Sequence, residues 1–87
     1  MEYYSPPRKL FEAAKSLTME TSQNDVCRLT GEIAQSRLFF GGDEGAALNK
    51  LYKLIAAFLE SLINKRTDSK SKLEQLTDFA SKQSEKY

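Results

Sequence analysis

Few residues of this 87-residue chain could carry out chemistry. It has one cysteine, Cys27, and no histidine. Nucleophile pairs that place a serine or a cysteine beside a histidine are therefore excluded. A structural zinc site normally uses cysteine and histidine ligands. Because this chain has so few of them, such a site would need an all-carboxylate ligand set. We predict no enzymatic activity, no metal and no other cofactor.

Two roles are open for Cys27. A reactive thiolate would be favoured by a nearby helix N-terminus and disfavoured by Asp25, two residues earlier in the chain. A lone cysteine cannot form an intrachain disulfide, which is the usual pattern of a cytosolic protein. We predict that Cys27 packs as a small apolar side chain.

The four residues Gly41-Gly42-Asp43-Glu44 resemble the signature turn of bacterial diguanylate cyclases. In that family the turn joins two strands, its glycines admit a nucleotide and its acids bind metal. Here the four residues lie between two helical patterns. We therefore predict that the glycines end one helix, because glycine adopts the left-handed conformation without steric cost. Asp43 would be the N-cap of the next helix.

Charge is distributed unevenly along the chain. Residues 1–45 carry five basic and seven acidic groups, whereas residues 46–87 carry eight basic and five acidic groups. This asymmetry is too weak for a nucleic-acid-binding surface, which shows a clustered basic stripe. The lysines of the last helix and Lys65-Arg66 could face anionic lipid headgroups or an acidic protein surface. They could equally form a solvated face with local ion pairs.

Neither a secretory signal nor a membrane span is predicted. Residues 1–7 lack a basic region followed by an apolar stretch. The most apolar stretch, residues 46–63, is interrupted by Asn49, Lys50, Lys53 and Glu60, whereas a span needs about 20 nearly uncharged residues. We expect a cytoplasmic protein with at most peripheral membrane contact.

Apolar residues at steps of three and four predict helices at about 6–20, 23–40, 44–65 and 69–84. Ser5 would cap the first helix, with Pro6 in its first turn, and Ser22 would cap the second. The third helix is apolar over a wide arc, so we place it at the centre. The apolar stripe of the fourth is thin, and we expect fraying after Ser81. The predicted stripes are Leu10, Phe11, Ala14 and Leu17; Val26, Leu29, Ile33 and Leu38; Leu48, Leu51, Leu54, Ile55, Phe58, Leu59, Leu62 and Ile63; and Leu73, Leu76, Phe79 and Ala80.

Short connections make neighbouring helices antiparallel. We therefore predict one all-α domain spanning residues 1–87, an antiparallel four-helix bundle with up-down-up-down topology and no sheet. Gly31, inside the second helix, would allow close helix packing or simply be tolerated, and a hinge is the alternative. Phe39 and Phe40 cannot both face the core, so one of them packs under a loop or is exposed as a possible interaction surface.

The pattern from about residue 10 to residue 80 also suggests a family. It is carried by Leu10-Phe11 and Leu17, residues 25–38, Leu48-Asn49-Lys50-Leu51 and Lys72-Leu73-Glu74-Gln75-Leu76. This arrangement resembles the immunity proteins of pediocin-like bacteriocins, the enterocin A immunity family of small four-helix bundles. In that family similar segments open the third and fourth helices. This chain is shorter than many members and has little tail after the fourth helix.

The resemblance implies a cytosolic protein of a Gram-positive bacterium that protects its producer from a membrane-permeabilising peptide. Members of the family bind stoichiometrically at the cytoplasmic face of the mannose phosphotransferase permease that carries the bacteriocin. Their C-terminal half decides which bacteriocin is countered. The candidate partner-binding residues lie on the hairpin of the third and fourth helices and at the chain end: Lys65, Arg66, Lys70, Lys72, Phe79, Lys82 and Tyr87.

Two other interpretations remain. A small rigid bundle without catalytic groups also suits a partner-binding adaptor, such as a secretion chaperone or a phage-encoded inhibitor. Such a module could use exposed aromatic side chains and dimerise through its second or third helix. A DNA-binding helical domain is disfavoured by the near-neutral charge, and it would require strongly salt-dependent binding to duplex DNA.

Overall fold

Four α-helices account for most of the computed structural model, which describes residues 7–86. They are α1 (Pro7–Lys15), α2 (Gln23–Ser36), α3 (Gly42–Ile63) and α4 (Ser69–Lys86). Residues 7–86 contain no strand. The prediction of an all-α fold with four helices is therefore confirmed.

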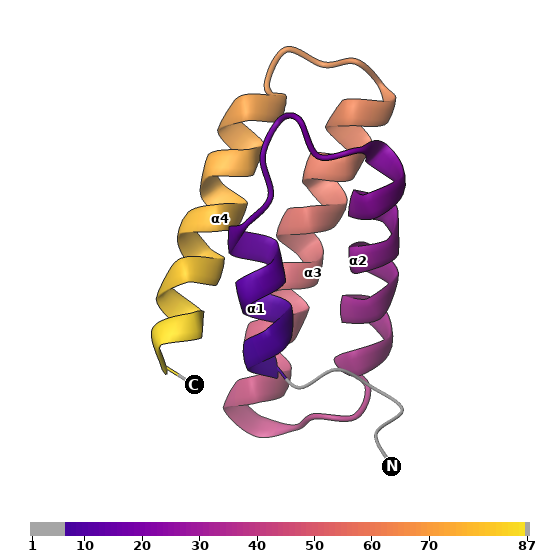
Figure 1. Cartoon of the computed structure of the whole chain (residues 1–87). Helices are drawn as coiled ribbons and strands as arrows, with labels where there is room; N and C mark the ends of the chain where they lie inside the picture. Colours follow the sequence, from indigo (N-terminus) through magenta and orange to yellow (C-terminus); the bar gives the residue numbers. More distant parts are fainter. Residues whose placement is uncertain (1–6, 87) are drawn as a thin grey trace.

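Each helix runs in the direction opposite to the preceding one (Figure 1). α1 packs mainly against α4, and α3 packs against both α2 and α4. The prediction that α3 is contacted on two sides is therefore confirmed. The connections at residues 16–22 and 64–68 lie at one end of the bundle, and residues 37–41 lie at the other (Figure 1). None of the helices within residues 7–86 is long and apolar enough to cross a membrane.

All four helices contribute apolar side chains to one core. Phe58 of α3 and Phe11 of α1 are its largest fully buried members. Most of the predicted stripe positions are buried, and Ser36, Ser61, Ser69 and Ser84 are buried with them. The buried apolar residues are Leu10, Phe11, Ala14, Leu17, Val26, Leu29, Ile33, Leu48, Leu51, Ile55, Phe58, Leu73, Leu76 and Ala80.

The first helix ends earlier than predicted, at Lys15 instead of near residue 20. Two threonine side chains stabilise the connection that follows α1. The Thr18 amide donates to Thr21 Oγ1 at 3.0 Å, and the Glu20 amide donates to Thr18 Oγ1 at 3.2 Å. Threonine hydroxyls compete with helical hydrogen bonds in this way. The predicted cap by Ser5 and Pro6 lies outside the described residues.

The second helix begins as predicted and ends earlier than predicted. Ser22 Oγ accepts a hydrogen bond from the Asp25 amide at 3.1 Å, which confirms the N-cap. α2 stops at Ser36, and the next residues form a tighter turn in which the Phe39 amide donates to the Ser36 carbonyl at 2.9 Å. Leu38 therefore leaves the apolar stripe and is 76% exposed, so its predicted burial is wrong.

The glycine pair opens α3 instead of ending α2. Gly41 is the N-cap, and Gly42 has a left-handed φ of 62°. Asp43 is therefore not the cap, although it and Glu44 lie in the first turn, where carboxylates favour the helix dipole. At Gly45 a Cβ atom would clash with the backbone of Phe40, so this position requires glycine.

Three other predictions on single residues are corrected. Cys27 is exposed on α2 and does not pack as an apolar side chain. Ile63 is 54% exposed, because α2 and α4 do not cover the whole apolar arc of α3. A Cβ atom at Gly31 would meet nothing within 4 Å, which excludes close helix packing at this position.

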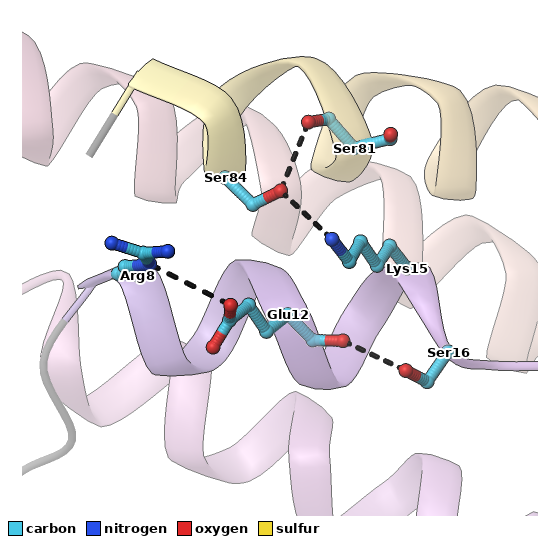
Figure 2. A network of polar contacts seen from close by, with 6 residues as sticks. All are labelled: Arg8, Glu12, Lys15, Ser16, Ser81 and Ser84. Carbon is cyan, nitrogen blue, oxygen red and sulfur yellow. Dashed lines mark hydrogen bonds and ion pairs between the residues drawn. The ribbon is translucent and has the colours of Figure 1, made fainter.

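The fourth helix continues to Lys86, past the predicted fraying point at Ser81. Contacts with α1 explain the extra turn (Figure 2). Lys15 Nζ donates to Ser84 Oγ at 3.4 Å, and Ser84 is itself buried and donates to the Ser81 carbonyl at 2.9 Å. The sequence pattern missed this contact because the residues that face α1 here are polar.

Candidate functional site

The α3–α4 connection contains an unusual backbone position. Lys65 has a left-handed φ of 53° and is the one residue other than glycine with a positive φ among residues 7–86. Its amide donates to the Leu62 carbonyl at 3.2 Å, and the Arg66 amide donates to the Ser61 carbonyl at 2.9 Å. This pair of bonds is a Schellman motif, in which the left-handed position is usually glycine. A side chain with a Cβ costs roughly 1–2 kcal/mol there.

A buried pair of hydroxyl groups fixes the two helices beneath this turn. Ser69 Oγ of α4 lies 2.9 Å from Ser61 Oγ of α3 and 3.2 Å from the Arg66 carbonyl. Ser61 Oγ in turn donates to the Phe58 carbonyl at 2.6 Å. The backbone that carries Lys65 is therefore held by contacts that do not involve the lysine side chain.

The side chains around this turn are predominantly basic. Residues 61–72 contain four basic groups and one acid, Asp68, which gives them a net charge of +3. Lys65, Arg66 and Lys70 are exposed, and Lys72 is half-buried. Arg66 Nε lies 3.6 Å from Asp68 Oδ1, too far for a hydrogen bond, and such exposed pairs contribute little. We call residues 61–72 the basic hairpin end.

A small hollow joins two of the predicted site residues. Arg66 and Lys72 both line it, together with Ala57, Glu60 and Ser61, and its volume is about 70 Å³. Pockets that hold organic ligands occupy roughly 300–1,000 Å³. The hollow is therefore too small for a metabolite, and the basic hairpin end is better suited to contact a surface.

The structure separates the other predicted site residues from this end. Phe79 is half-buried and packs edge-on against Phe11, with ring centroids 6.2 Å apart, while Lys50 Nζ lies 5.0 Å above its ring. Phe79 therefore joins α1, α3 and α4. Lys82 pairs with Asp78 at 3.2 Å and lies about 18 Å along α4 from Lys70 at the helical rise per residue.

Tyr87 lies outside the described residues. The predicted site is thus reduced to four residues that lie together on the α3–α4 hairpin: Lys65, Arg66, Lys70 and Lys72.

Comparison with known protein families, curated proteins and solved structures finds no match. Within residues 7–86, no group of three or more cysteine, histidine, aspartate or glutamate side chains could hold a metal ion.

A wider hollow of about 540 Å³ lies open between the end of α1 and the middle of α4. It is lined by polar and charged side chains, whereas ligand pockets are mostly apolar. Its acid Asp78 is already paired with Lys82. We assign it no ligand. The lining residues are Lys15, Ser16, Glu74, Thr77, Asp78 and Ser81.

Sequence reasoning missed two apolar side chains at the same end as the basic hairpin. Ile63 is 54% exposed at the end of α3, and Met19 is 48% exposed in the 16–22 connection. One signal could have indicated Ile63. An apolar arc wider than two neighbouring helices can cover must leave an edge exposed, and Ile63 lies at such an edge.

The opposite end of the bundle exposes a different apolar pair. Leu38 is 76% and Phe39 57% exposed, while Phe40 packs against the core. The prediction that Phe39 and Phe40 do not both face inward is confirmed. Arg37 stabilises the turn by donating to Asn49 Oδ1 at 3.0 Å.

Proposed function

We propose that the chain is a bacteriocin immunity protein that binds stoichiometrically at the cytoplasmic face of the receptor complex. The proposed partner is the mannose phosphotransferase permease of a Gram-positive cell while it carries the bacteriocin. The observation that best supports a binding role for the α3–α4 hairpin is Lys65. Lysine occupies this position although its left-handed backbone conformation favours glycine.

The hairpin has the properties that a stoichiometric blocker needs. Buried hydroxyl contacts between Ser61 and Ser69 fix the turn, so binding would cost little conformational entropy. The exposed basic side chains could then complement an acidic surface on the partner and determine specificity. Lys65, Arg66, Lys70 and Lys72 are the residues that we assign to this contact.

Protection of a sensitive cell tests the proposal. The chain is expressed in a bacteriocin-sensitive enterococcal or Listeria-like strain, and growth inhibition by a panel of pediocin-like peptides is compared with an empty-vector control. We expect selective resistance to one or a few peptides. Absence of protection against the whole panel, with expression verified by immunoblot, would contradict the proposal.

Charge reversal on the hairpin then locates the contact. The variant Lys65→Glu should lose protection while its helical circular dichroism is unchanged. Lys82→Glu is the matched control, because Lys82 is also an exposed lysine and its partner, Asp78, lies on the same helix. Equal loss in both variants would mean that general charge, not the hairpin, determines protection.

A partner-binding adaptor is the second candidate. It is favoured by one observation, the exposed pair Leu38 and Phe39 at the end away from the basic hairpin. An adaptor that uses this end should be disabled by Leu38→Ser with Phe39→Ser. The immunity proposal expects protection to survive that change.

A further inference from the structure

The basic hairpin end combines two kinds of exposed side chain. Ile63, 54% exposed, ends α3 two residues before Lys65. The connection at residues 16–22 lies at the same end of the molecule (Figure 1). It contains Met19, which is 48% exposed, and one acid, Glu20. Apolar side chains next to lysine and arginine are the combination that binds the interface of an anionic bilayer.

The opposite end shows that exposed apolar side chains alone do not make such a surface. Leu38 and Phe39 are exposed at least as much as Ile63. However, the charged residues from Arg37 to Asn49 are Arg37, Asp43 and Glu44, which give this segment a net charge of −1. Carboxylates are repelled by anionic lipid headgroups. The two ends therefore differ in charge, although the exposed fractions of their apolar side chains are similar.

We propose that the basic hairpin end docks on the surface of an anionic phospholipid bilayer. In this arrangement Ile63 enters the headgroup region, and Lys65, Arg66 and Lys70 bind lipid phosphates. The long axis of the bundle then stands away from the bilayer, with Leu38 and Phe39 remote from it. The inference rests on the proposed function: the same basic side chains bind lipid phosphates at the inner face of the membrane before they contact the acidic surface of the partner.

We expect this docking to be weak, because the attracting net charge is small and is screened by salt. Residues 61–72 have a net charge of +3, and electrostatic attraction to a bilayer is screened over about 10 Å at 0.1 M salt. Binding should therefore be reversible and should fall as salt is added. A weak lipid contact concentrates the protein at the membrane without holding it there, which suits a protein that must find a receptor.

Vesicle binding by the full chain is the first test. Vesicles of phosphatidylcholine alone are compared with vesicles of phosphatidylcholine and phosphatidylglycerol in equal parts, at low and physiological salt, by co-sedimentation. We expect binding to the anionic vesicles that is at least about tenfold tighter than to the neutral ones and that declines with salt. No binding to either, or equal binding to both, would overturn the proposal.

Orientation is tested with a fluorescent side chain, because the chain has no tryptophan. Ile63→Trp places the probe at the basic hairpin end, and Leu38→Trp is the matched control at the opposite end. Both positions are exposed, so neither change disturbs the core. We expect a blue shift on anionic vesicles for Ile63→Trp alone. A shift for Leu38→Trp alone, or equal shifts for both, would contradict this orientation.

Charge reversal separates this proposal from the function on which it rests. Lys65→Glu should reduce vesicle binding several-fold, and Lys82→Glu, which changes the net charge by the same amount, should not. If the unaltered chain protects cells but ignores vesicles, the lipid proposal fails and the hairpin contacts protein. If it binds vesicles but protects no cell, the immunity proposal fails and lipid docking stands.

Discussion

The α2–α3 and α3–α4 connections both contain a residue with a left-handed backbone conformation, but the residue types differ. Each turn needs a left-handed residue, Gly42 with a φ of 62° and Lys65 with a φ of 53°. Glycine adopts this conformation without steric cost, whereas lysine does not. Strained positions persist where the surrounding structure over-determines them, and they cluster at functional sites. The difference thus points to the α3–α4 turn as the one whose side chain is used.

The two ends also differ in how charge accompanies exposed apolar residues. Leu38 and Phe39 belong to a segment, residues 37–49, with a net charge of −1, whereas Ile63 belongs to residues 61–72, with a net charge of +3. The same core supports both ends through α3. Changes in the core should therefore affect the ends together, and changes in a turn should affect one end alone.

The largest effect is expected for Phe58→Ala, in the shared core. The ring is 1% exposed, and its removal should destabilise the fold by about 3–5 kcal/mol. Because both ends depend on this core, amide hydrogen exchange should accelerate at the two connections alike. Chemical denaturation checks the magnitude. An unchanged midpoint, or faster exchange at one end only, would show that the ends are supported separately.

A smaller effect is expected for Gly45→Ala, confined to the α2–α3 end. The new Cβ would meet the Phe40 carbonyl, which belongs to the backbone and cannot rotate away. The turn must shift, at a cost of about 1–3 kcal/mol. Denaturation gives the magnitude, and vesicle binding by the basic hairpin end should be retained. If stability is unchanged, the turn adapts at little cost.

The comparison of the two turns is tested most directly by Lys65→Gly. Relief of the left-handed strain should raise the free energy of unfolding by about 1 kcal/mol. Protection and vesicle binding should fall at the same time, because the exposed ammonium group is lost. A variant that is more stable and equally active would show that the lysine side chain has no role. Unfolding curves and the protection assay are measured on the same protein.

Periodic apolar spacing predicted the helices, because a helix that buries one face needs apolar residues at steps of three and four. It predicted the stripes around Phe11, Ile33 and Phe58 correctly, and it also predicted the cap by Ser22. Helix ends were less predictable, since they depend on local competition by side chains such as Thr18 and Thr21.

The candidate site was only partly predictable. Sequence indicated the basic residues of the hairpin, but not that Lys65 is left-handed, because that follows from how the Schellman turn closes. It grouped Phe79 and Lys82 with them, although packing against α1 and distance along α4 separate both from the turn. It also placed Leu38 and Ile63 inside, since periodicity does not show which edge of an apolar arc lacks a neighbour.

The smallest effect is expected for Gly31→Ala, and it serves as the control for Lys65→Gly. Nothing lies within 4 Å of the new methyl group, and the site is an exposed helix interior. Alanine should therefore stabilise α2 by about 0.5–1 kcal/mol. This gain is close to the one expected at Lys65, but protection and vesicle binding should be unchanged. If Gly31→Ala lowered protection as much as Lys65→Gly does, the added stability would explain both losses. If it leaves protection intact, the loss at Lys65 belongs to the lysine side chain.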